Sequence, residues 1–352
     1  VERLGLAGRV QHPPPFATSP CMQQLAACGV RPLEGAWGNA TLRASQLEES
    51  FAVATDFPSA APNAFTFSAR SDRGLLHRAE WVKFMALFFN LEAEAQRILD
   101  DETREFAALR GELAALQAAP GAAAEPPVVA WVAHRDFYSE DYPEAFVFSF
   151  AAYKSELTEA AGGRTLPREL LEGAAVPVGE DLELRPGNAT DNARDVLLAA
   201  LGGADVIVDE TYALDPTAYT LETFLEEMGL QGAPREQLPP AVREGRVFRV
   251  DGRVSQSLGL DWFESALAQP DLLLRDMARA LHPEALPAGS PYRWLRNVAA
   301  GEPVRVVGPE QCEDPYVCRN ATLQICARDE RPCGGGQRVS RAGPDCAFPA
   351  CP

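Results

Sequence analysis

Two stretches of the sequence gather side chains that could perform acid–base chemistry or hold a metal ion. The first reads HRDFYSEDY at 134–142 and offers His134, and the second ends the apolar run ADVIVDE with Asp209 and Glu210. A single histidine at a strand end is more often a polar loop residue than a base or a ligand. Adjacent carboxylates on a strand point to opposite faces, which favours a solvated loop over a catalytic pair. We therefore expect no enzyme activity, no catalytic residue and no metal site.

Motifs and charge exclude further classes of function. The sequence contains no G-x-S-x-G, H-E-x-x-H, P-loop or G-x-G-x-x-G pattern. Its 352 residues carry a net charge of −18, whereas a nucleic-acid binder needs a basic face to meet phosphates. The longest apolar candidate, WVKFMALFF, is too short to span a bilayer. These features favour a protein that binds a small molecule over one that binds nucleic acid.

Two tryptophans lie where a ligand could meet them. Trp37 and Trp262 occur in turn-like stretches, GAWGNA and GLDWFESA, with glycines or acids around them, whereas Trp131 lies in the apolar run VVAWVA. A tryptophan on a loop offers a large apolar face at little entropic cost, which suits a binding cleft. The local pattern alone leaves Trp37 and Trp262 open between core packing and ligand contact, and it places Trp131 in the core.

The elements that must position these residues begin with one long helix. Apolar residues recur at helical spacing over 75–119, which is long for a single globular helix. Asn90 offers a break, after which a new helix can start with Glu92 and Glu94 in its first turn. The pattern predicts a short helix followed by one of roughly 28 residues, about 40 Å long, which could bridge two lobes.

Short apolar runs and helical patterns alternate on both sides of this helix. We expect strands at 9–10, 50–56, 64–69, 127–133, 204–210 and 245–251, and helices around 143–162, 220–229 and 272–283. Such alternation predicts an α/β fold of two lobes, each a mainly parallel sheet flanked by helices. The expected parts are an N-terminal lobe at 1–90, a connecting helix at 91–119, a C-terminal lobe at 126–300 and a disulfide-rich tail at 301–352. Ligands gather at the carboxyl ends of strands in such lobes.

Cysteines and glycosylation sequons indicate an oxidising, extracellular setting. The eight cysteines are Cys21, Cys28, Cys312, Cys318, Cys326, Cys333, Cys346 and Cys351. An even count with a dense terminal group predicts disulfides, whose pairing the sequence leaves open. Asn39, Asn188 and Asn320 each begin an N-A-T sequon. Together they predict a secreted or cell-surface protein of the eukaryotic secretory pathway, with glycans at the three asparagines.

Several motifs resemble one class of binding proteins. GAWGNATL, AVATDF and LDWFESALAQP resemble segments of bacterial vitamin B12 binders in the helical-backbone class of periplasmic substrate-binding proteins, over roughly 1–285. SPCMQQLAACG, WGNATLRASQLE, RAEWVKFMALFFNLEAEA and YRWLRN are more similar to the algal cobalamin acquisition proteins. The resemblance implies two α/β lobes joined by one long helix, and cobalamin bound in the cleft between them without chemistry.

The resemblance also implies a set of ligand-binding residues. Trp37 and Trp262 match cleft tryptophans of the bacterial relatives, and Phe57 stands near the place of a third. With the loops that follow the expected strands, the candidate cobalamin-binding residues are His12, Phe16, Trp37, Asp56, Phe57, Arg135, Phe137, Tyr138, Tyr212 and Trp262. The implied partners are cobalamin and a membrane receptor or transporter, with the protein itself a monomer. The alternatives are a ferric-siderophore or haem binder, and a structural or adhesion role for the tail.

Overall fold

The computed structural model describes residues 1–35, 38–119, 125–136, 138–186, 193–286, 291–313, 318, 330–332 and 338–340. It divides into two compact units. The smaller unit comprises Val1–Val53, Ala60–Phe65 and Val307–Pro352, and the larger unit comprises Ala54–Ser59 and Thr66–Val306. These boundaries differ from the expected ones, because residues 66–90 belong to the larger unit and the tail belongs to the smaller one.

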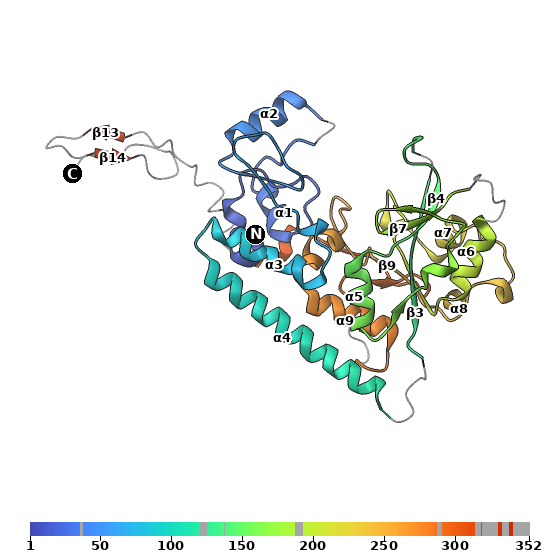
Figure 1. Ribbon diagram of the computed structural model, residues 1–352. Helices are drawn as coiled ribbons and strands as arrows, with labels where there is room; N and C mark the ends of the chain where they lie inside the picture. The colour runs from blue at the N-terminus through green and yellow to red at the C-terminus, as the bar shows by residue number, and fades with distance from the viewer. Residues whose placement is uncertain are drawn as a thin grey trace. The chain divides into compact units, whose positions relative to one another are not determined.

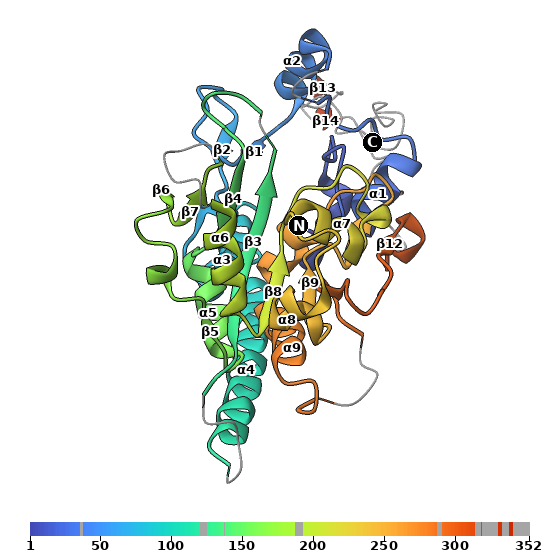
Figure 2. The ribbon, with the colours of Figure 1, turned by 90° about the vertical axis from the view of Figure 1, so that its right-hand side faces the viewer.

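An eight-stranded mixed sheet forms the centre of the larger unit. Its strands are β3 (Val128–Arg135), β4 (Ala145–Phe148), β5 (Arg164–Thr165), β6 (Val176–Val178), β7 (Asp181–Leu184), β8 (Val206–Asp209), β9 (Val247–Arg249) and β11 (Arg296–Asn297). They lie in the order β11-β9-β8-β3-β4-β7-β6, with β5 also paired to β3. Figure 2 shows β4, β3, β8 and β9 side by side.

Strand direction in this sheet departs from the expected mainly parallel arrangement. Strands β5, β8 and β9 follow the parallel pattern around β3. Strands β4, β7, β6 and β11 pair antiparallel with their neighbours. The reason is local: β4 follows β3 through a short hairpin, and a hairpin can only produce antiparallel neighbours.

Helices cover both faces of the sheet (Figure 1). One face packs against α3 (Leu75–Leu87), α4 (Glu92–Gln117), α5 (Ala152–Ala160) and α9 (Pro270–Leu281), and the other against α6 (Ala193–Gly202), α7 (Leu221–Glu227) and α8 (Pro240–Arg243). Side chains alternate along β3 accordingly: Val129 and Trp131 enter the first core, whereas Val128 and Ala130 enter the second. The predicted α/β fold class is confirmed, and so is the core position of Trp131, which is 1% exposed.

The break in the long helical pattern falls where the sequence predicts it. Helix α3 ends at Leu87, and Asn90 adopts a positive φ of 53°, which stops a right-handed helix. Helix α4 then begins at Glu92 and has 26 residues, so it is about 39 Å long. It buries Phe106 and Leu109 against the larger unit.

Other expected elements differ. The segment 143–162, expected to be a helix, begins with strand β4, because the apolar run AFVF fits a buried strand as well as a helix. The strand expected at 9–10 is instead the end of a 3₁₀ helix, Ala7–Arg9. The remaining elements of the larger unit that matter below are β10 (Arg253–Ser255), paired with β12 (Arg305–Val307), and the 3₁₀ helices η3 (Ala69–Ser71), η7 (Asp261–Phe263) and η8 (Ser265–Ala268).

The smaller unit is mainly helical where it is described. It contains α1 (Pro20–Ala27), α2 (Ala40–Glu49), and two hairpins, β1 (Val53–Thr55) with β2 (Ala64–Thr66) and β13 (Glu330–Pro332) with β14 (Arg338–Ser340). The boundary with the larger unit runs through the first hairpin. The second mainly parallel sheet expected from the sequence is absent from these residues, because the connections within both strand pairs are shorter than the crossover of about a dozen residues that parallel neighbours need.

Two disulfides attach the start of the tail to α1. Cys21 pairs with Cys312 and Cys28 with Cys318, over Cα–Cα distances of 4.6 and 5.7 Å. Cys21 and Cys28 are two helical turns apart and therefore lie on the same side of α1. The predicted disulfide bonding is confirmed for these four cysteines. Cys326, Cys333, Cys346 and Cys351 lie outside the described residues.

Of the three sequon asparagines, Asn39 lies within the described residues. Asn39 is the N-cap of α2: it is exposed, and its side-chain oxygen accepts a hydrogen bond from the Leu42 amide at 3.0 Å. Its side-chain nitrogen has no part in that hydrogen bond. Asn188 and Asn320 lie outside the described residues.

Within the described chain, none of the helices has the length and apolar character needed to cross a membrane.

The paired disulfides predict non-additive stabilisation. When one bond is intact, the second closes a loop of about 15 residues and adds about 3 kcal/mol to the free energy of unfolding. When neither bond is present, the first bond to form closes a far longer loop, between residues 291 apart in sequence. Its loss therefore lowers the free energy of unfolding by about 5 kcal/mol, in addition to the loss of the second bond. We expect Cys21→Ser/Cys312→Ser to cost about 3 kcal/mol, and removal of both bonds to cost more than the sum of the two single losses. Guanidinium unfolding followed by circular dichroism measures both; strict additivity would contradict the expectation.

Candidate functional site

A pocket of about 300 Å³ lies within the larger unit. The residues that give it chemical character come from η3, α3, α5, η7 and α9, and they are Arg70, Arg78, Tyr153, Trp262, Phe263 and Leu273. Aromatic and aliphatic side chains therefore form its wall, and two guanidinium groups supply positive charge. Apolar walls with a few fixed polar groups are the usual composition of a small-molecule site.

Trp262 is a core residue that also lines this pocket. It is 2% exposed, and its ring centroid lies 5.9 Å from that of Trp131 in the core. A tryptophan exposed on a turn is therefore the wrong description of Trp262. Its neighbour Phe263 on η7 is 52% exposed and lines the same pocket. Any ligand contact of Trp262 stays a prediction.

A chain of buried hydrogen bonds holds η7 in place. The carboxylate of Asp261, 1% exposed, accepts from Trp294 Nε1 at 2.9 Å and pairs with Arg253 Nε at 2.9 Å. Asp276 on α9 in turn accepts the backbone amides of Arg293 and Trp294, at 2.7 and 2.6 Å. Because both carboxylates act on the same short segment, 293–295, they fix the turn that carries Trp262 and Phe263.

Burial dominates the titration of Asp276. Loss of solvation raises the pKa of its carboxyl group to about 6, against the smaller lowering effect of the backbone hydrogen bonds from Trp294, Leu295 and Arg293. The folded protein therefore binds the Asp276 proton more tightly than the unfolded chain does.

A buried lysine lies near the core tryptophan Trp131. Lys154, 7% exposed, donates from Nζ to Glu210 at 2.5 Å and to Ser149 at 2.8 Å, and lies 5.5 Å from the ring centroid of Trp131. Burial acts to lower the pKa of Lys154, but the charge of Glu210 and of Tyr153 and the hydrogen bond to Glu210 outweigh it, so the pKa is raised. Glu210 is therefore part of a buried ion pair, and its expected place in a solvated loop is wrong.

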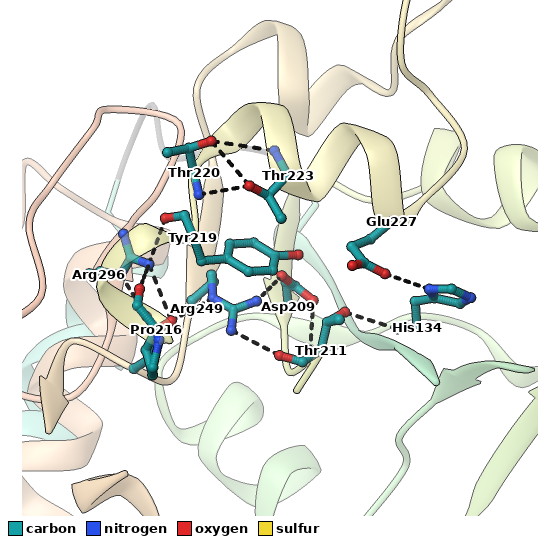
Figure 3. Close-up of polar contacts among 11 residues, drawn as sticks. His134, Asp209, Thr211, Pro216, Tyr219, Thr220, Thr223, Glu227, Arg249 and Arg296 are labelled. Carbon is teal, nitrogen blue, oxygen red and sulfur yellow. Dashed lines mark hydrogen bonds and ion pairs between the residues drawn. The ribbon is translucent and has the colours of Figure 1, made fainter. Parts of the chain in front are cut away.

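The carboxyl ends of β8 and β9 carry a closed network of buried charges (Figure 3). Arg249 bonds to Asp209, to Asp251 at 2.6 Å and to the carbonyl of Thr211 at 2.9 Å. Its guanidinium carbon lies 3.5 Å from the ring centroid of Tyr219. Burial acts to lower the pKa of Arg249. The charges of Asp209 and Asp251 outweigh this effect, so the pKa is raised. Asp209 is 0% exposed, so it stabilises the fold and offers nothing to a substrate.

The histidine singled out in the sequence is likewise engaged within the protein. His134 Nδ1 lies 2.6 Å from Glu227 on α7, and Nε2 lies 3.6 Å from Glu144 (Figure 3 shows the first contact). Among the described residues, no group of three or more His, Cys, Asp or Glu side chains has the geometry to hold a metal ion.

The structure brings some of the predicted ligand residues to the pocket. Arg70, on the pocket wall, pairs with Asp56 at 3.0 Å and lies 5.7 Å from the ring centroid of Phe57. Asp56 and Phe57 therefore adjoin the pocket that Trp262 lines. Phe57 is 65% exposed, so its ring is free to meet a ligand.

The other predicted residues do not line this pocket. Arg135 is bound to Glu183 at 2.7 Å and to the Pro143 carbonyl at 3.0 Å. Tyr138 and Tyr212 are more than three-quarters exposed, in the loops after β3 and β8. The predicted residues of the smaller unit are His12, hydrogen-bonded to the Arg31 carbonyl, and Phe16, which is exposed. Trp37 and Phe137 lie outside the described residues.

Sequence reasoning missed the pocket residues Arg70, Arg78 and Tyr153. For the two arginines, the sequence held one indication. The polar stretch ARSDRG lies directly before a helix, and its arginines stand near the helix start, where acidic residues are usual. Tyr153 gave no signal, because its contact with Arg78 joins two helices that lie far apart in the sequence.

Comparison with known proteins gives a fold but no family. No protein-family profile and no curated protein matches the chain. Among solved structures, the chain is similar to CeuE from Helicobacter pylori with Ni(II) bound, at a TM-score of 0.51 and 12% identity, over 81% of this chain and 80% of that one. It is also similar to a periplasmic binding protein from Veillonella parvula, at a TM-score of 0.50 and 15% identity, over 80% and 86%. The fold is therefore that of periplasmic binding proteins.

The raised pKa of Asp276 predicts a pH effect on stability. A folded-state pKa of about 6, above the ordinary 3.8, gives stability that is fully present below about pH 4 and lost as pH rises through 6. We expect the free energy of unfolding of the native protein, relative to Asp276→Asn, to fall by about 2.4 kcal/mol between pH 4 and pH 7. Denaturant unfolding of both proteins across this range measures it; a difference that stays constant with pH would contradict the assignment.

Proposed function

We propose that the protein binds a small molecule without chemistry, and that the ligand is cobalamin. The pocket carries this proposal: an aromatic wall with two guanidinium groups, within a fold shared with periplasmic binding proteins. The charged groups that a reaction could use, Asp209 and Glu210, are instead held in ion pairs by Arg249 and Lys154. Binding of a ligand without chemistry requires no free acid or base, so it is compatible with Asp209 and Glu210 being held in ion pairs.

Cobalamin fits the character of the surface. A corrin ring has broad apolar faces edged by amides, so exposed aromatic rings such as Phe57, Phe263 and Tyr212 can stack on it or accept its edge. The pocket volume of about 300 Å³ is at the lower end for small-molecule sites, so it would hold one part of the vitamin. The motifs shared with cobalamin acquisition proteins, including LDWFESALAQP around Trp262, support the same ligand.

A second candidate is an anionic ligand such as haem or a ferric siderophore. Arg70 and Arg78 on the pocket wall favour it, because guanidinium groups pair well with carboxylate oxygens. The structurally similar protein from Helicobacter pylori was solved with Ni(II) bound. For this chain, we rank the anionic chelate below cobalamin, because Arg70 is already paired with Asp56.

The setting we propose is the outside of a eukaryotic cell. The two disulfides suit an oxidising compartment. Asn39 begins a sequon and is exposed, so it is accessible for N-glycosylation. The protein would act as a secreted or surface-attached monomer, glycosylated also at Asn188 and Asn320, and would pass its ligand to a membrane receptor or transporter.

Calorimetric titration of the intact glycosylated protein distinguishes the candidates. We expect heat on addition of cyanocobalamin and little on addition of haem or a ferrichrome-type siderophore. Binding of haem alone would move the assignment to the second candidate, and no heat with any of the three would remove both.

The pocket wall supplies a sharper test. Phe263→Ala should weaken cyanocobalamin binding at least about tenfold, or roughly 1.4 kcal/mol of lost contact. Phe263 is preferable to Trp262, because truncating a buried tryptophan would cost stability and obscure the result. Phe88→Ala is the matched control, since Phe88 is 51% exposed on the end of α3 and does not line the pocket. Equal affinities for the two variants would exclude the pocket as the cobalamin site.

A further inference from the structure

Arg78 is the guanidinium in the pocket that forms no ion pair with any described residue. It lies in the first turns of α3, where its Nε donates to the carbonyl of Asp72 at 2.8 Å and its guanidinium carbon lies 3.6 Å from the ring centroid of Tyr153. The other arginine of the pocket, Arg70, has its counter-ion in Asp56 at 3.0 Å. Arg78 is thus fixed in orientation by a hydrogen bond and a stacking contact, without a paired carboxylate.

The nearest acid is occupied elsewhere. The two carboxylate oxygens of Asp72 accept from Trp81 Nε1 at 3.1 Å and from the Gly74 amide at 3.3 Å. Burial lowers the pKa of Arg78, and the hydrogen bond to Tyr153 and the charge of Asp72 only partly oppose this effect. A cation that has lost solvent without gaining an ion pair raises the free energy of the empty site. An anionic group brought by a ligand would offset that cost.

We infer that Arg78 binds an anionic oxygen group of the ligand, an inference that rests on the proposed function and adds a charged subsite to it. The planar guanidinium can form two parallel hydrogen bonds to a phosphate or carboxylate, and its stacking on Tyr153 holds the plane in advance. Trp262 and Phe263 line the same pocket and would contact the apolar part beside the anionic group. The pocket volume of about 300 Å³ suits such a group better than a whole corrinoid.

Two ligands present this chemistry in different forms. Cobalamin carries one phosphodiester, in the arm that holds its nucleotide base, and haem carries carboxylates at its edge. Each has a partner that keeps the ring and lacks the charge: cobinamide lacks the phosphodiester arm, and haem dimethyl ester has its carboxylates blocked. The haem pair differs in charge at the carboxylates, whereas cobinamide also lacks the ribose and the base. For the corrinoids, the Arg78 variants identify the part of the preference that comes from the phosphodiester.

The test compares both ligand pairs with the native protein, Arg78→Gln and Arg78→Lys by calorimetric titration. We expect the native protein to bind cyanocobalamin at least about tenfold more tightly than cobinamide, and Arg78→Gln to bind the two about equally. Arg78→Lys keeps the charge without the planar fork and should retain part of the preference. Arg73→Gln is the control and should keep all of it, because Arg73 is exposed, pairs with Glu180 and does not line the pocket.

Other binding results would contradict either the role of Arg78 or the proposed function. If the native protein binds cobalamin and cobinamide equally, the inference is overturned and the proposed function stands; this comparison needs no variant and is independent of how the variants fold. A preference that survives in Arg78→Gln overturns the inference as well. If neither corrinoid binds, cobalamin capture is wrong, and the haem pair decides by the same criterion whether Arg78 recognises the acid. Failure of all four ligands removes the function and the subsite together.

Discussion

The buried charge network around Arg249 is the interaction on which the arrangement of strands β8, β9 and β11 in the larger unit depends. Three strand ends meet there, because Asp209 closes β8, Arg249 closes β9 and Arg296 on β11 bonds to Asp251 at 2.6 Å. Arg296 also holds the carbonyls of Pro216 and Tyr219, at 3.1 and 3.0 Å. The loops leaving β8 and β9 therefore start from fixed points. A buried ion network of this kind stabilises one arrangement because losing a single member leaves the remaining charges buried and unpaired, at about 3–5 kcal/mol.

The same principle, that a buried charge needs a partner, separates structural residues from candidates for binding. Asp209, Glu210 and His134 looked chemically available in the sequence, yet each is held by another side chain of the larger unit. Arg78 has the opposite status, with a hydrogen bond and an aromatic face but no paired carboxylate among the described residues. A ligand can therefore change the electrostatics of the pocket at Arg78 far more than at the strand-end acids.

Sequence reasoning succeeded where local forces decide the structure. The end of α3, the positive φ at Asn90 and the acidic start of α4 follow from capping and from the helix dipole, which act within a few residues. It also recognised β3, because a continuous apolar run at 128–132, mostly β-branched or aromatic, fits a strand covered on both faces.

It failed where distant contacts decide. Strand β4 is a strand because β3 and β7 lie beside it, and its four residues alone cannot indicate that. The burial of Trp262 depends on Trp131, far away in sequence, and the pocket assembles residues from six separate elements. The disulfide partners were unpredictable for the same reason, since the sequence leaves every pairing of the cysteines open.

Those disulfides have a consequence for how the protein responds to proteolysis. The chain between Cys28 and Cys312 contains the whole of the larger unit, and both ends of that stretch are covalently fixed at α1. A protease that cuts once anywhere within it produces two polypeptides that remain a single molecule. If the cut falls in a surface loop, the packed elements on either side stay at high effective concentration and can remain assembled. The protein could be nicked in its surroundings and still keep its pocket.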